Sequence, residues 1–185
     1  MHAEIELVTI KWTAGLCQAS CIRGLEQQFR RIQGVTNVKI NGDQAQADLA
    51  WSPNAPFSFR AIEGAMAFIG LSMNDLRVTV RGTVRHDERS VILTSTGDLS
   101  QFVLMSPPPM SFNMYVEVNS PLNRELTPQV RSILLAAEQN QQTVVISGPL
   151  FHPETSPPLF LTVESVNVVQ NASTENPRSR KSDRF

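Results

Sequence analysis

Hydrophobic residues along the first eighty positions or so recur at two spacings, every second residue or every third to fourth residue. The first spacing is typical of strands and the second of amphipathic helices. An Asn-Gly-Asp sequence between two strand-like runs predicts a hairpin, and glycines follow both helical runs, where they commonly end helices. The predicted elements are a strand over residues 5–12, a helix from Cys21 to Gly34, a hairpin turning at 41–43, a helix opened by 52–54 and ended by Gly70, and a strand through 76–80.

This order of elements predicts an α+β fold. Strand, helix, strand, strand, helix, strand is the ferredoxin-like βαββαβ arrangement, in which two helices cover one face of an antiparallel four-stranded sheet. The pattern accounts for residues 1–83 as a first domain. Many functions share this fold, so the function has to be argued from the site.

The chain after this point is dominated by strand-like runs. Three strands, a helix and two strands form the element order of an OB-fold, a small Greek-key barrel. We therefore expect an OB-fold-like five-stranded β-barrel with one helix over residues 84–170, its first strand beginning near residue 78, and a disordered polar tail over 171–185. Gly82 and Gly148 lie within strand runs, where a curling barrel needs a kink. The predicted strands are 78–86, 91–104, 114–118, 143–150 and 159–169, with the helix at 124–140.

The junction between the two predicted domains contains no proline and alternates like a strand. We expect the last strand of the first domain to run almost directly into the first strand of the barrel, around residues 80–84. A long flexible linker is not expected there.

Composition and charge exclude several classes of protein. With 41% hydrophobic and 18% charged residues, the 185-residue chain has the composition of a globular protein. No apolar run approaches the roughly 20 residues that cross a bilayer, and the first residues carry acid where a secretory signal carries basic residues. We expect a cytoplasmic protein without membrane insertion, unless a leader was removed.

The predicted barrel is acidic, with five Lys and Arg against eight Asp and Glu over residues 81–170. Attraction to phosphates supplies most non-specific affinity for nucleic acids, so we expect no nucleic-acid binding and assign the barrel to a protein partner. The sequence contains no Ser-His-Asp arrangement, phosphate-cradling glycine loop or paired-carboxylate motif. We therefore do not expect an enzyme.

Two cysteines, Cys17 and Cys21, provide the candidate chemistry. They are too few for a disulfide framework, and they lie between a predicted strand and the start of a predicted helix, where the loop can bring both thiols together. The N-terminus of a helix stabilises a thiolate, the form that binds metals and attacks disulfides. Thiolates select soft or borderline ions such as Cu(I) and Zn(II). The spacing also fits a reversible local disulfide.

The sequence around the cysteines resembles a known family. The run GLCQASC at 15–21, the helix after it and the Gly-Val-Thr-Asn-Val run at 34–38 are similar to the heavy-metal-associated domain of copper chaperones and copper-transporting P-type ATPases. The usual loop of that family is Gly-Met-Thr-Cys-x-x-Cys, followed by Gly-Val-x-x-Val. Here Cys17 stands at the Thr position and Gln18 at the first Cys position, so three residues separate the cysteines instead of two.

The resemblance covers residues 4–83 and implies a copper-type, soft-metal binding protein. Such a protein would carry or sense Cu(I), or another soft ion such as Zn(II), through Cys17 and Cys21, and would dock a protein partner. Met66 and Met73, around the end of the second predicted helix, offer thioethers as a third soft ligand, although the helical spacing of Met66 fits a core position better.

Two other interpretations remain open from the sequence. In the first, the metal loop is degenerate, the chain binds no metal, and both domains serve protein contacts as a structural adaptor. Cys17 is then an ordinary loop thiol and Cys21 packs as a small apolar residue. In the second, the pair is a thiol redox module that cycles between thiols and a disulfide.

Overall fold

The computed structural model describes residues 5–107, 124–155 and 157–169. The strand predicted at 114–118 and the tail predicted at 171–185 lie outside the described residues. The elements, in chain order, are β1 (Ile5–Trp12), α1 (Ala19–Arg30), β2 (Val35–Asn41), β3 (Gln46–Trp51), α2 (Phe59–Phe68), β4 (Met73–His86), β5 (Val91–Ser95), β6 (Gln101–Met105), α3 (Pro128–Gln139), β7 (Thr143–Phe151), the 3-10 helix η2 (Pro153–Thr155), β8 (Leu159–Thr162) and β9 (Ser165–Val169).

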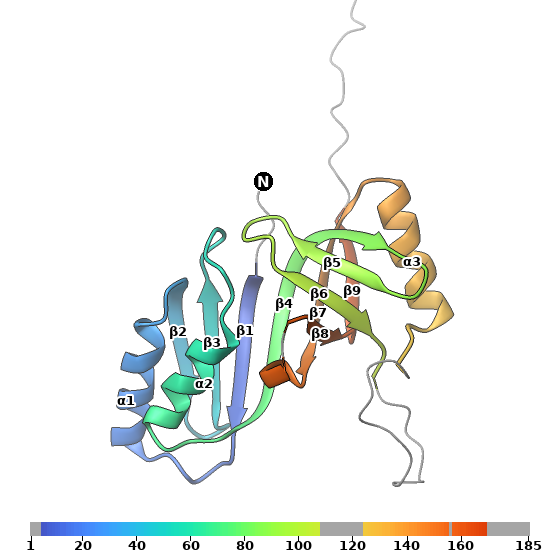
Figure 1. The fold of residues 1–185 in the computed structure, drawn as a ribbon. Helices are drawn as coiled ribbons and strands as arrows, with labels where there is room; N and C mark the ends of the chain where they lie inside the picture. The colour runs from blue at the N-terminus through green and yellow to red at the C-terminus, as the bar shows by residue number, and fades with distance from the viewer. Residues whose placement is uncertain (1–4, 108–123, 156, 170–185) are drawn as a thin grey trace, which may run out of the picture.

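The first four strands form an antiparallel sheet in the order β2-β3-β1-β4 (Figure 1). Their register places Val38, Leu49, Val8 and Val78 next to one another across the sheet, and all four are buried. The next residue along β1, Thr9, is only half-buried and points to the opposite face, because side chains alternate along a strand. The sheet therefore has one apolar and one polar face.

Both α1 and α2 cover the apolar face of this sheet (Figure 1). Leu25 and Phe29 of α1 are buried, as are Ile62 and Met66 of α2. Each pair is four residues apart, the spacing that places two side chains on one face of a helix. The helices and the sheet thus share one core.

The later strands close into a barrel. Five strands follow one another in the order β4-β5-β6-β8-β7, and β7 pairs with β4 to complete the ring. The β6–β8 pair is parallel and the others are antiparallel, while β9 pairs with β7 outside the ring. The chain is therefore an α+β protein with a closed five-stranded β-barrel.

Two glycines lie where backbones of the barrel approach each other closely. A Cβ atom on Gly148 would stand 1.8 Å from the carbonyl oxygen of Thr162, and one on Gly82 would stand 2.3 Å from that of Thr94. Neither position has room for a side chain, since both obstacles are backbone atoms. Close approach is therefore the reason for glycine at these two positions.

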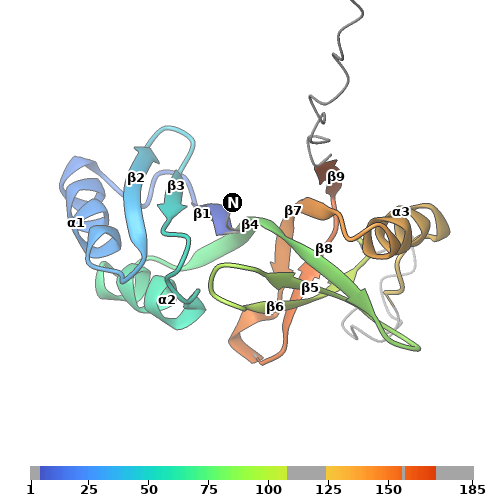
Figure 2. The ribbon, with the colours of Figure 1, turned by 90° about the horizontal axis from the view of Figure 1, so that it is seen from above.

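Strand β4 belongs to both parts of the molecule (Figure 2). Its first eight residues pair with β1, its last five pair with β5, and residues 77–82 pair with β7. The nine strands that the structure describes are consequently connected in one hydrogen-bonded sheet. The boundary predicted after residue 83 falls inside β4. The sequence analysis expected two strands here, one following directly on the other, and the structure has one continuous strand.

A polar contact also joins the barrel to the first part. The carboxylate of Asp98, in the connection between β5 and β6, accepts a hydrogen bond from the backbone N–H of Phe57 at 3.1 Å. Phe57 immediately precedes Ser58, the N-cap of α2. The barrel thus helps to fix the start of this helix.

Two of the predicted strands are each divided in two. The run 91–104 forms the separate strands β5 and β6, with Leu99 between them in a left-handed conformation at φ +60°. The run 159–169 forms β8 and β9, which have different partners: β8 pairs with β6 and with the end of β7, whereas β9 pairs with the first part of β7. The single-strand prediction was wrong for both runs.

Two predicted helices begin later than expected. Residues 52–54 do not open α2, whose N-cap is Ser58; its hydroxyl oxygen accepts a backbone N–H of the first turn at 3.2 Å. The helix predicted from 124–140 begins at Pro128, with Thr127 as its N-cap. In both cases a side-chain cap fixes the start.

Candidate functional site

The loop between β1 and α1 holds Cys17, and the first turn of α1 holds Cys21. Gly15 adopts a left-handed backbone conformation at φ +82°, which glycine adopts without steric cost. The chain then reaches Gln18, the residue before α1, and the carbonyl of Gln18 accepts the first helical hydrogen bond at 2.9 Å from Ile22. The loop thereby directs Cys17 back over the first turn of the helix.

Cys17 and Cys21 are joined by a disulfide, with their Cα atoms 5.3 Å apart. This separation lies within the ordinary range for a disulfide. Cys21 is on the first turn of α1, and both cysteines are half-buried against the edge of the core. The structure therefore brings together the two residues that the sequence analysis selected.

The start of α1 presents little that would oppose a negative charge. Its first turn contains no acidic residue, and Gln18 makes no side-chain hydrogen bond to the helix N-terminus. The first backbone N–H groups of a helix favour an anion, and they would stabilise a thiolate formed at Cys21 on reduction. The pair forms a disulfide in this structure, and its reduction would release two thiols at the start of α1.

The cysteine loop is held against the start of β4. The side-chain amide of Asn74 donates a hydrogen bond at 3.0 Å to the hydroxyl oxygen of Thr13. A Cβ atom on Gly24 of α1 would stand 3.0 Å from the Ile69 side chain, so the two helices approach closely there. The start of the loop is held at a second point, since the backbone N–H of Trp12 donates to the carbonyl of Ala45 at 3.0 Å.

The two methionines considered as a third ligand belong to a different place. Met66 is 1% exposed, and it lines a cavity together with Met73 between α2, β4 and the β7–η2 segment. Neither cysteine contributes to the walls of this cavity. The structure thus gives no support to a thioether ligand at the cysteine pair, and Met66 is a core residue.

In the part of the chain that the structure describes, no His, Asp or Glu side chain joins the cysteine pair as a further ligand. Over the described ranges, no group of three or more His, Cys, Asp and Glu side chains is arranged to hold a metal ion. His86 forms a hydrogen bond with Glu138, and His152 forms one with Glu154 at 2.7 Å. Both of these histidines are in the barrel part of the chain, so within the described residues a metal at the cysteines would have the two sulfurs as its ligands.

The carboxylates of these two histidine pairs are electrostatically perturbed. The hydrogen bond from His86 holds the pKa of Glu138 below its ordinary range, and the bond from His152 does the same to the pKa of Glu154. Sequence reasoning did not find either pair, because their members come from distant segments or from a turn without a recognisable motif.

Comparisons with protein families, with curated proteins and with solved structures found no match to this chain. The resemblance to heavy-metal-associated domains therefore rests on the residues quoted for it. Among the helices that the structure describes, none has the length and apolar character to span a bilayer.

Proposed function

We propose that this chain binds one soft metal ion, with Cu(I) as the best fit, through the thiolates of Cys17 and Cys21, and that it carries or senses the ion while a protein partner docks. The observation that carries the proposal is the convergence of two thiols at a helix N-terminus that has no competing carboxylate. The metal is cargo in this proposal, and no enzyme activity is involved.

The fold around the cysteines supports the comparison with heavy-metal-associated domains. The strand order β2-β3-β1-β4 with two helices on one face agrees with a ferredoxin-like unit. Gly34, at the start of the Gly-Val motif, has φ +98°, and a Cβ there would lie 2.6 Å from that of Ala55. The backbone conformation and the close contact with Ala55 therefore both favour glycine at position 34. The barrel is compatible with an OB-like module.

The number of ligands favours Cu(I) over Zn(II). Zinc sites are almost always four-coordinate, so two thiolates leave two positions for water or a partner. Two sulfurs complete a linear Cu(I) site without further ligands, provided that they lie roughly 4–5 Å apart on opposite sides of the ion. With Cα atoms 5.3 Å apart, changes of the cysteine rotamers can separate the sulfurs once the disulfide is reduced.

An exposed apolar side chain beside the site favours partner docking. Leu16, the neighbour of Cys17, is 65% exposed. Phe68, at the end of α2, is 74% exposed and is adjacent to Ile69, which packs against α1. A partner that receives the metal would cover the cysteine loop and could bury Leu16 in the same contact.

The disulfide favours a second candidate, the thiol redox module. In this case two protein thiols reduce a low-molecular-weight disulfide such as oxidised glutathione. The products are the Cys17–Cys21 disulfide and two small thiols, and the two electrons pass to the sulfurs of the oxidant. The thiols would then be the active form, and no metal would be needed.

A competition titration separates the candidates. The reduced chain is titrated with Cu(I) against a chromogenic Cu(I) chelator, in parallel with Zn(II). We expect one Cu(I) per chain, and a severe loss of affinity in Cys17→Ser and in Cys21→Ser, because the serine oxygen is a ligand that Cu(I) disfavours. Cys21 should matter at least as much as Cys17, since Cys21 lies on the first turn of α1.

Met73→Leu serves as the matched control, because it removes a soft sulfur from a cavity that neither cysteine lines. The Cu(I) affinity of this variant should equal that of the wild type. If the wild type binds Cu(I) no better than the double serine variant, metal binding is lost as a function. A fast exchange with oxidised glutathione would then support the redox module, and slow exchange would leave the structural adaptor.

A further inference from the structure

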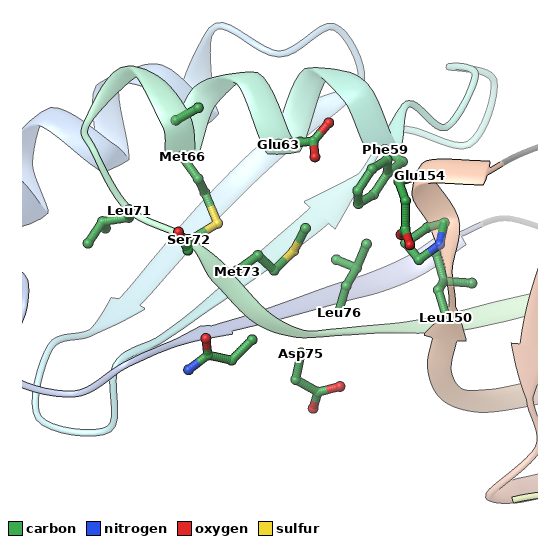
Figure 3. Close-up of a pocket in the computed structure, with 13 residues that line it drawn as sticks. Phe59, Glu63, Met66, Leu71, Ser72, Met73, Asp75, Leu76, Leu150 and Glu154 are labelled. Atoms are coloured by element: carbon green, nitrogen blue, oxygen red, sulfur yellow. The ribbon is translucent and has the colours of Figure 1, made fainter. Parts of the chain in front are cut away.

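A cavity of about 460 Å³ lies between the two parts of the molecule (Figure 3). Its walls come from α2, the beginning of β4, the end of β7 and η2. Small-molecule sites commonly have volumes of about 300–1,000 Å³ and lie at the junction of two structural units. Size and position therefore make this cavity a candidate binding site.

The inner walls of the cavity are apolar. The close-up shows the side chains of Met66, Met73 and Leu76 in the space between α2 and β4 (Figure 3). Phe59 and Leu150 complete this surface from α2 and from β7, and all of these residues except Met73 are buried. The cavity can thus remove an aliphatic chain from water.

The charged residues that line the cavity all carry the same sign. Glu63, Asp75 and Glu154 contribute carboxylates, and no Lys, Arg or His is among the described lining residues. Asp75 is already bound by Arg77, whose Nε lies 2.7 Å from its carboxylate. An anionic ligand would meet net repulsion at this site.

Among the described residues, Glu63 and Glu154 form no ion pair with Lys or Arg, so both carboxylates can act on a ligand. Glu63 forms no hydrogen bond or ion pair with any described residue, and it lies on the exposed side of α2. Glu154 points toward the cavity from η2 (Figure 3). Its hydrogen bond with His152 holds the pKa of Glu154 below the ordinary range, so the carboxylate is ionised at neutral pH.

We propose that this cavity binds a small organic cation, namely a primary ammonium group attached to an aliphatic chain. The ammonium would lie between Glu63 and Glu154 at the opening, and the chain would contact Phe59 and Leu76 inside. The site uses neither cysteine, so it is a function separate from the proposed metal binding.

The test uses hexylammonium as the probe and the full chain in solution. Binding is followed by two-dimensional amide NMR, with hexanoate, hexanol and butylammonium as comparison ligands. We expect saturable shifts in α2, β4 and η2 with hexylammonium and weaker binding of hexanol. Hexanoate should not bind. Each methylene that is buried should tighten binding by about fourfold, so butylammonium, which has two fewer, should bind about fifteenfold more weakly.

Charge variants complete the test. Glu63→Gln/Glu154→Gln keeps the size of both side chains and should weaken hexylammonium binding several-fold without affecting hexanol, because exposed charges contribute modestly. Glu88→Gln removes an exposed carboxylate from the β4–β5 turn and should change nothing.

Several outcomes would overturn the proposal: no saturable shift with millimolar hexylammonium, equal binding of hexanoate, or unchanged affinity in the Glu63→Gln/Glu154→Gln variant. The Cys17→Ser/Cys21→Ser variant should bind the probe as the wild type does. Loss of metal binding and loss of cation binding are therefore separate results.

Discussion

Reduction of the Cys17–Cys21 disulfide should lower the stability of the chain measurably without unfolding it. The two residues are four apart in sequence, so the cross-link closes a very short loop. In the chain-entropy description, closing a loop of this length restricts the unfolded chain by about 2 kcal/mol. For a protein of this size, the loss corresponds to a decrease of about 4–8 °C in melting temperature.

The fold should survive because its core does not depend on the pair. Both cysteines are half-buried at the edge of the core, whereas residues such as Val8, Leu25 and Phe29 are fully buried inside it. The deep core remains in place when the sulfurs separate. Reduction should therefore affect mainly the loop and the first turn of α1.

The assay is thermal unfolding followed by circular dichroism, with and without a phosphine reductant. The wild type should lose about 4–8 °C on reduction and should keep a single cooperative transition. The Cys17→Ser/Cys21→Ser variant should have a melting temperature close to that of the reduced wild type. The reductant should not change this temperature, because the variant has no disulfide to reduce. A reduced protein that has lost cooperative melting would refute the reasoning, because the disulfide would then be needed for folding.

Three other changes test the fold at separate points. Gly148→Ala should cost about 3 kcal/mol or more in the free energy of unfolding measured with urea, because its Cβ would lie 1.8 Å from a backbone oxygen. Asp98→Ala should cost about 2 kcal/mol by the same measurement, since it removes the acceptor of the Phe57 N–H. The hydrogen bond with His86 lowers the pKa of Glu138 in the folded protein. The bond therefore stabilises the fold at pH values above the ordinary glutamate pKa of about 4.3. This stabilisation is lost as the pH falls through the lowered pKa. Glu138→Gln should therefore lose less stability than the wild type when urea unfolding is compared at about pH 5 and pH 3.

Matched controls exist for these variants. Gly64 lies in α2, and a Cβ there would meet no atom within 4 Å, so Gly64→Ala should be neutral or stabilising by up to about 1 kcal/mol. Asp98→Asn keeps an oxygen acceptor and should retain part of the stability that Asp98→Ala loses. Equal losses in Asp98→Asn and Asp98→Ala would contradict the role assigned to the hydrogen bond.

The sequence pattern predicted the structure correctly where residues close together in the chain determine it. The strand Ile5–Trp12 has the predicted limits, because its β-rich composition continues until the chain reaches the cysteine loop. Cys17 and Cys21 could be paired in advance for the same reason, since four residues of sequence limit how far apart they can lie. Their redox state depends on the surroundings, so sequence alone left thiolate, metal and disulfide open.

Two of the wrong predictions come from local signals that were assigned incorrectly, and the cavity depends on a long-range contact. The Thr-Gly-Asp sequence before Leu99 is a turn signal, but it lies within a run of strand-forming residues and was read as part of one strand. The start of α2 is set by Ser58 rather than by the earlier proline and asparagine. The cavity could not be predicted, because its walls bring Leu76 together with Glu154 from the other part of the chain.

The sharing of β4 determines how the chain can be divided for experiments. A fragment that ends at His86 would keep β4 but would lose β7, the partner of residues 77–82. The backbone N–H and C=O groups on this edge of β4 would then be unpaired. The remaining fragment would lack the strand that closes its ring. We expect each fragment to aggregate alone and the two to reassemble when they are mixed during refolding. A metal titration on the excised first part would therefore report on a damaged sheet.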